Sequence, residues 1–322
     1  MVTIDAHAHI YPENYWSALL KIAERVTFPI DVQRILYFFP KESVLVQAEE
    51  TLGLMENLGI DGMILSLSLP NVYMPDPAMS LDLAQMANDA YAEIQRLFPG
   101  KFYVLASVPL HFPELAIREL DRAIRKLNMS GIVLGSNIAG RPLSSPEFFP
   151  FYERVNALKL PIFIHPMSPP HADQKDEFFL IPLVDYIYES TRAVIAMVFA
   201  GVFEQFRNLT LVLPHLGGAI PYIKGRIDGG YQNHPPCQKN ISKPPSEYFK
   251  EFYYDTVSLD VQAIRYALET VGPEHLVFGT DYPFMSLKNI RLINESLEKI
   301  GLSPKDREAI EGKNVFRLLH NP

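Results

Sequence analysis

The chain has 322 residues, which is long enough for one large barrel or two ordinary domains. Hydrophobic residues make up 48% of it, enough to bury a substantial core, and the formal net charge of -8 argues against nucleic acid or an anionic membrane as partner. A single cysteine excludes an internal disulfide and any zinc site built from several cysteines.

The first residues show no basic region followed by an apolar one, as a secretory signal would. The longest apolar run, residues 193–203, is too short to span a bilayer. We therefore expect a cytoplasmic protein whose partner is a small molecule.

Strands and helices alternate through the first half of the chain. A strand is expected at residues 3–11, followed by a helix at 14–25, an irregular insertion at 26–43 and a helix at 44–58. Buried strands are then predicted at 61–68 and 102–108, with a long helix at 78–98 between them.

The same alternation continues to the end of the chain. Strands are predicted at 130–134, 161–166, 210–215, 252–257 and 276–281. Helices are predicted at 113–127 and 146–158, between strands six and seven before a proline-rich loop at 234–245, and from residues 287 and 304 onward. Residues 181–206 are apolar on most faces, as expected of one long helix packed between a barrel and another subunit.

Eight mostly continuous apolar strands with helices between them indicate an α/β fold, a TIM (β/α)8 barrel. We expect it to be distorted, with a small insertion after strand one and additional helices at the C-terminal end. A doubly wound open sheet is the competing arrangement, but it does not explain why polar residues follow the strands. No internal repeat or linker divides the sequence, so residues 1–322 are expected to form a single domain.

The first strand carries two histidines, His7 and His9. Side chains alternate along a strand, so we expect both imidazoles on one face and the apolar side chains on the other, namely Ile4, Ala6, Ala8 and Ile10. Imidazole is the commonest metal ligand in proteins, so the pair can share one cation. An isolated His-x-His is more often a pair of solvated side chains, and the rest of the chain must supply further ligands.

Chemistry in parallel barrels lies at the C-terminal ends of the strands. Strands five, six and eight are expected to end in His165, His215 and Asp281, at the same mouth as the two histidines of strand one. Each of the three could alone be a satisfied core residue or a turn former. Together they favour a functional site, because a buried carboxylate is costly unless it is paired or bound to a metal.

Several motifs resemble the amidohydrolase superfamily, and the resemblance covers nearly the whole chain. They lie at residues 161–166, 189–191, 215–221 and 279–283. Within the superfamily they are most similar to the branch of aminocarboxymuconate semialdehyde decarboxylase, which also includes resorcylate decarboxylases, hydratases and lactone hydrolases. The resemblance implies one divalent metal ion, most readily zinc and otherwise manganese, cobalt or iron, bound by His7, His9, His165 and Asp281. The fourth strand has no lysine to bridge a second metal.

The resemblance also implies roles in the reaction. His215 would lie beside the metal-bound oxygen as a general acid and base, and Asp281 would transfer a proton as well as hold the metal. Arg226 would reach a neighbouring subunit's site to hold a substrate carboxylate, which predicts a homodimer. A solvated arginine on a helix surface is an equally good interpretation of Arg226.

The favoured function is non-oxidative decarboxylation of a small unsaturated or aromatic carboxylic acid by this metal. The same ligands would serve a hydrolase of a lactone, an amide or a vinylogous carbon-carbon bond. A metal-binding barrel without turnover is the third hypothesis. Gly218 stands where some aromatic-acid decarboxylases of the branch carry a glutamate, which favours a linear or non-phenolic substrate.

Overall fold

The computed structural model describes residues 2–23, 48–170, 176 and 178–319. The predicted insertion at 26–43, the end of the helix predicted at 14–25 and the first residues of the one predicted at 44–58 lie outside the described residues.

The eight barrel strands are short and buried along almost their whole length. They are β1 (Ile4–His9), β2 (Gly62–Ser66), β3 (Phe102–Ser107), β4 (Gly131–Gly135), β7 (Pro161–His165), β8 (Thr210–Leu213), β9 (Tyr253–Asp255) and β10 (Leu276–Val277). They form one sheet in that order, and every adjacent pair is parallel. A separate two-stranded hairpin, β5 (Asn137–Ile138) and β6 (Arg141–Pro142), follows β4.

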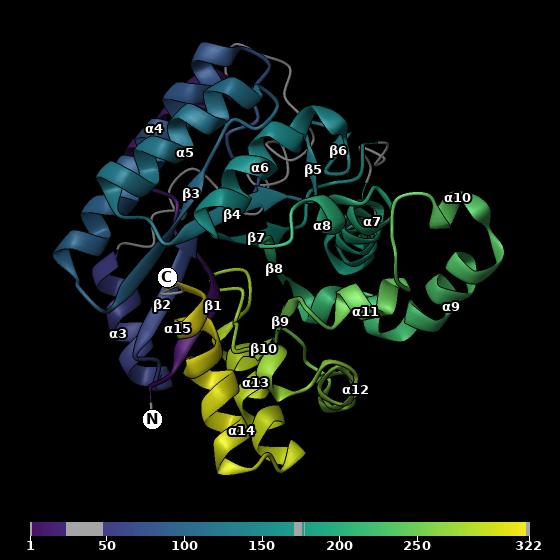
Figure 1. Cartoon of the computed structure of the whole chain (residues 1–322). Coiled ribbons are helices and arrows are strands. Elements are labelled where there is room, and N and C mark those ends of the chain that lie inside the picture. The colour runs from purple at the N-terminus through teal and green to yellow at the C-terminus, as the bar shows by residue number, and fades with distance from the viewer. Residues whose placement is uncertain (1, 24–47, 171–175, 177, 320–322) are drawn as a thin grey trace.

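Backbone hydrogen bonds join the two ends of this sheet. Ala6 N donates to Phe278 O over 2.7 Å, and Asp281 N donates to His7 O over 2.8 Å. First and last strands are thereby held side by side, and the predicted (β/α)8 barrel is confirmed (Figure 1).

Helices surround the barrel (Figure 1). They are α1 (Glu13–Ala23), α3 (Ala48–Leu58), α4 (Pro77–Leu97), α5 (Pro113–Leu127), α6 (Phe149–Leu158), α7 (Tyr186–Phe199), α8 (Val202–Gln205), α9 (Ile220–Asn233), α10 (Pro235–Gln238), α11 (Pro245–Phe249), α12 (Val261–Val271), α13 (Leu287–Ile300), α14 (Pro304–Glu308) and α15 (Asn314–Leu319). Local sequence signals start several of them. At α4, the Asp76 side chain accepts a hydrogen bond from Met79 N over 2.8 Å, and Pro77 is the first helical residue. Among the described residues, none of these helices combines the length and the apolar composition that a bilayer crossing requires.

The core has two parts. An outer cluster lies between the strands and the helices, and an inner cluster fills the barrel. The inner cluster contains buried side chains from almost every strand, such as Ile64, Val133 and Phe163, together with Val315 and Leu318 of α15.

Strand β1 departs from the predicted alternation. Ile4 and Ala6 belong to the inner cluster, whereas Ala8 and Ile10 belong to the outer one, so the expectation that they share a face is wrong. The cause is a shift in the register of β1 against β2 between Asp5 and Ala8. A bulge of this kind reverses the alternation, so that His7 as well as Ala6 faces the interior.

The single helix predicted over 181–206 is also wrong. The segment consists of a π-helical turn, η2 (Ile181–Asp185), followed by α7 and α8. Gly201, with φ of 77°, separates the last two helices. A Cβ atom at this position would lie 2.6 Å from Asn240 O, so the close approach requires glycine.

Candidate metal centre

Four predicted ligands converge at the C-terminal end of the strands. His7 and His9 come from β1, His165 ends β7, and Asp281 follows β10, and one donor atom of each lies within 4.8 Å of the others. Asp281 Oδ1 is 3.4 Å from His7 Nε2 and 3.3 Å from His9 Nε2. Bonds of about 2.0–2.1 Å to a tetrahedral ion place neighbouring ligand atoms about 3.3–3.4 Å apart. These two distances therefore fit a shared cation.

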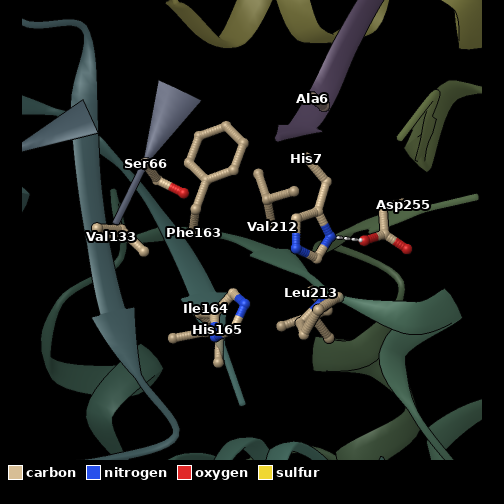
Figure 2. A pocket seen from close by; sticks show the side chains of 11 residues that line it. Ala6, His7, Ser66, Val133, Phe163, Ile164, His165, Val212, Leu213 and Asp255 are labelled. Carbon is tan, nitrogen blue, oxygen red and sulfur yellow. Dashed lines mark hydrogen bonds and ion pairs between the residues drawn. The ribbon is translucent and has the colours of Figure 1, made fainter. Parts of the chain in front are cut away.

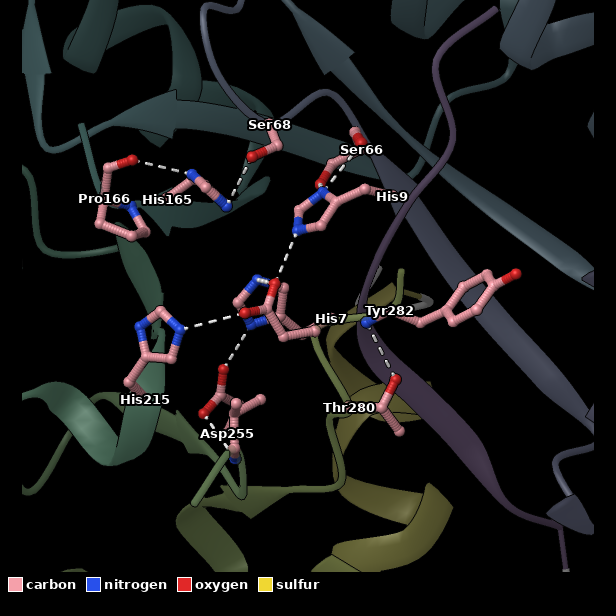
Figure 3. A network of polar contacts seen from close by, with 12 residues as sticks. His7, His9, Ser66, Ser68, His165, Pro166, His215, Asp255, Thr280 and Tyr282 are labelled. Atoms are coloured by element: carbon pink, nitrogen blue, oxygen red, sulfur yellow. Dashed lines mark hydrogen bonds and ion pairs between the residues drawn. The ribbon is translucent and has the colours of Figure 1, made fainter. Parts of the chain in front are cut away.

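Hydrogen bonds at the Nδ1 atoms set the tautomers of His9 and His165 (Figure 3). His9 Nδ1 lies 3.1 Å from Ser66 O, and His165 Nδ1 lies 2.9 Å from Pro166 O. A carbonyl oxygen can only accept, so each Nδ1 carries the proton and each Nε2 has a free lone pair. Ser68 Oγ lies 3.1 Å from His165 Nε2.

His7 is held in the same way by a carboxylate. Its Nδ1 lies 2.6 Å from Asp255 Oδ2. The buried atoms His7 Nε2, His9 Nε2 and Asp281 Oδ1 have no hydrogen-bond partner among the described residues. Unsatisfied buried polar atoms are costly, and three that face one point are explained by a metal ion at that point.

The charges of the ligands agree with metal binding. Burial lowers the pKa of His9 and lowers that of His165 further, which keeps both imidazoles neutral, as ligands must be. Burial raises the pKa of Asp281, but the charge of His7 and the hydrogen bond with His215 outweigh it and hold this pKa well below its ordinary value. Burial lowers the pKa of His7, yet Asp281 and Asp255 raise it to about 9. A dication would oppose that protonation by repulsion.

His215 approaches the cluster from the other side of Asp281. Its Nε2 lies 3.4 Å from Asp281 Oδ2, and it begins the short turn η3 (His215–Gly217) after β8. His215 and Leu216 have φ of 52° and 55°, values that residues with a side chain rarely adopt. Such strain persists only where the surroundings enforce it, and it directs His215 to the site.

Asp5 and Thr280 connect the first strand to the segment that carries Asp281. The Asp5 carboxylate accepts hydrogen bonds from Thr280 Oγ1 at 2.5 Å, Thr280 N at 3.0 Å and His7 N at 3.0 Å. Burial raises the pKa of Asp5 to about 7. The sequence alone predicts no role for Asp5 or Asp255, although the first precedes the His-x-His pair and the second lies within the strand predicted at 252–257.

Arg226 is separate from these buried residues. It lies on the exposed surface of α9. Its predicted contact with a substrate in a neighbouring subunit stays a prediction.

A small cavity lies beneath the histidines (Figure 2). Its volume is about 20 Å³, room for about one water molecule, and apolar side chains such as Val133, Phe163 and Val212 line it. This space cannot hold a substrate. Because chemistry in parallel barrels lies at the C-terminal ends of the strands, we expect a substrate to reach the ligands from that side.

Comparison with known proteins gives consistent matches. A family model described as Amidohydrolase matches residues 4–320. The chain is 30% identical over 286 residues to gamma-resorcylate decarboxylase of Polaromonas sp. (strain JS666), which covers 82% of this chain and 86% of that protein. It is 35% identical over 213 residues to 2-amino-3-carboxymuconate-6-semialdehyde decarboxylase of Dictyostelium discoideum. This match covers 66% of this chain and 59% of that protein, so it spans less than two thirds of the relative's length.

A solved structure has the same fold. It is a dihydroxybenzoic acid decarboxylase from Polaromonas sp. JS666 with bound manganese and the inhibitor 2-nitroresorcinol. The TM-score is 0.83 at 26% identity, and the match covers 99% of this chain and 96% of that one.

Proposed function

Because the chain belongs to the amidohydrolase family, we propose that it is a metal-dependent decarboxylase that releases carbon dioxide non-oxidatively from a small unsaturated or aromatic carboxylic acid. The observation that carries this proposal is the convergence of three imidazole nitrogens and the Asp281 carboxylate, with His215 on the second oxygen of that carboxylate. The relatives described above, all named as decarboxylases, support the reaction class.

His7, His9, His165 and Asp281 would hold the metal ion. When bound, a divalent ion supplies a Lewis acid that withdraws electrons from a substrate oxygen and stabilises the charge left on carbon. Three imidazoles and one carboxylate suit zinc, and the same donor set also accepts manganese, the metal of the Polaromonas structure. Elemental analysis of protein purified without chelators distinguishes the two metals.

Loss of carbon dioxide leaves an electron pair on the substrate carbon, which must receive a proton. His215 Nε2 and Asp281 Oδ2 lie 3.4 Å apart at the edge of the cluster, so this pair can hold the proton and deliver it. The reaction then balances as a carboxylate plus a proton giving carbon dioxide and a carbon-hydrogen bond. The surrounding side chains are mostly buried, which limits competing transfer from water.

The proposal also includes a homodimer. In this dimer, Arg226 of one subunit would hold the carboxylate of a substrate bound in the site of the other subunit. Large apolar side chains are exposed on the segments near Arg226: Leu183 at 67%, Tyr188 at 61% and Tyr222 at 83%. These segments contact each other, since Ala219 N donates to Thr191 Oγ1 over 2.8 Å. Exposed apolar surface of this kind is typical of an interface, here with a second copy of the chain.

Mixed dimers test the role of Arg226. Arg226→Ala and His215→Gln are each expected to lose activity, whereas a heterodimer of the two variants contains one site with both wild-type groups. Recovery of up to half the wild-type activity supports action across the interface. A monomeric protein, or no recovery in isolated heterodimers, contradicts it.

The reaction class is tested by product analysis. Metal-loaded protein is incubated with gamma-resorcylate, with 2-amino-3-carboxymuconate-6-semialdehyde and with a series of lactones, and both carbon dioxide and ring-opened acids are measured. We expect carbon dioxide from at least one acid. Ring opening without carbon dioxide release would establish the hydrolase alternative, and bound metal without any turnover would favour a non-catalytic barrel.

A further inference from the structure

We propose that Asp255 is a positioning residue that sets both the metal ligand His7 and the proton-transfer residue His215. Asp255 is the last residue of β9 and is 1% exposed. Its Oδ2 accepts the hydrogen bond from His7 Nδ1 over 2.6 Å, as Figure 2 shows. Its Oδ1 accepts hydrogen bonds from Leu216 N at 3.2 Å and from Val257 N at 3.0 Å.

The three groups around Asp255 are all donors. An ionised carboxylate only accepts hydrogen bonds, so it satisfies all three at once. The bond to His7 fixes the proton on Nδ1 and leaves the Nε2 lone pair for the metal. No other described acceptor contacts His7 Nδ1 in this structure, so the tautomer of His7 depends on Asp255.

The second oxygen acts on the turn that carries His215. Leu216 N directly follows His215, and both residues have the unfavourable positive φ. The hydrogen bond at Leu216 N helps to hold the turn in this strained conformation, from which the backbone would otherwise relax. One rigid carboxylate therefore fixes His7 relative to His215, whose ring centroids are 5.6 Å apart.

Asp255→Asn tests this inference, which rests on the proposed metal site. The asparagine amide has one oxygen, which accepts, and one NH2 group, which donates. In one orientation the NH2 group faces the His7 N–H, and in the other it faces the backbone N–H groups. In both orientations two donors face each other. We expect affinity for Zn²⁺, measured by competition with a chelator, to fall about 10- to 100-fold, with a parallel loss of kcat.

Glu119→Gln is the matched control. Glu119 is also 1% exposed and its Oε1 accepts a hydrogen bond from Asn88 Nδ2 over 2.7 Å, but it lies on α5 outside the cluster of donors. The control loses a buried negative charge and some stability, and its Zn²⁺ affinity should equal that of the wild type.

The outcomes separate this inference from the proposed function. If the wild type binds no metal, the proposed function fails. If the wild type binds Zn²⁺ and Asp255→Asn binds it within two-fold with unchanged kcat, only the role of Asp255 is overturned. If Asp255→Asn does not fold, the tautomer of His7 is measured instead by ¹⁵N NMR on wild-type protein that is loaded with zinc and labelled at histidine. A His7 protonated on Nε2 would contradict the inference.

Discussion

Gly218→Ala should damage both the stability and the active site of this protein. Gly218 ends the turn that carries His215, with φ of 64° and ψ of -125°, a conformation that essentially only glycine adopts. The added Cβ atom would lie 2.4 Å from Thr191 Oγ1 and 2.5 Å from Ile187 O. One of these atoms is backbone of a packed helix, so the turn itself must move.

The cost has two sources. Forcing a residue with a side chain into this backbone region costs about 1–3 kcal/mol. The turn must move by almost 1 Å to lengthen the contact between the added Cβ atom and Ile187 O from 2.5 Å to an ordinary 3.4 Å. This movement loosens the 2.8 Å hydrogen bond from Ala219 N to Thr191 Oγ1, which is worth about 1 kcal/mol. We expect the free energy of unfolding to fall by about 2–4 kcal/mol. A displacement of this size at His215 should also lower kcat by about 100-fold.

Urea denaturation and steady-state kinetics measure the two effects. Gly229→Ala is the control, because Gly229 lies in α9 with no atom within 4 Å of the added Cβ and should gain about 0.5–1 kcal/mol. A Gly218→Ala protein as stable and as active as the wild type would refute the reasoning.

Further predictions concern the metal, the proton and an outlying carboxylate. His215→Gln should lower kcat by about 10²–10⁴-fold. Its metal content should stay that of the wild type, because His215 is not among the four clustered donors. Loss of bound metal in this variant would instead show that His215 is a metal ligand. Chelation should abolish activity and lower the Tm, and metal at about 100 times its Kd should restore about 2.7 kcal/mol of stability, as calorimetry can measure. Hydrogen bonds from Ser242 and Tyr248 lower the pKa of Glu204 to about 2 from an ordinary 4.5. Its folded pKa is depressed, so this carboxylate stabilises the fold above about pH 4.5 and the contribution is lost as the pH falls toward 2. Glu204→Gln should therefore be less stable than the wild type at pH 6 and converge with it near pH 2 in denaturation curves; an equal difference at both pH values would contradict this origin.

The strands and the convergence of the four donors could be predicted because their causes are local. Apolar runs bounded by turn residues define buried parallel strands, and the ends of such strands share one mouth. The predicted strand at 161–166 therefore locates His165 without knowledge of any contact.

Features that depend on contacts between distant segments could not be predicted. The helix break at Gly201 depends on Asn240, whose Nδ2 donates to Phe199 O over 3.0 Å. The partner of His7 is Asp255, which is 248 residues away in the chain. A pattern of apolar and polar residues contains no information on which carboxylate will meet which imidazole.

The bulge in β1 also depends on contacts between distant segments, and it determines where His7 and His9 point. Ala6 and His7 both face the interior because β1 pairs with β2 on one side and with the segment after β10 on the other. His9 N donates to Tyr282 O over 2.7 Å, next to Asp281, so the bonds that close the barrel also bring the first and last ligands together. A metal bound by all four donors must therefore stabilise the closed barrel over any open form of the sheet, which is why we expect metal removal to affect the fold as well as the reaction.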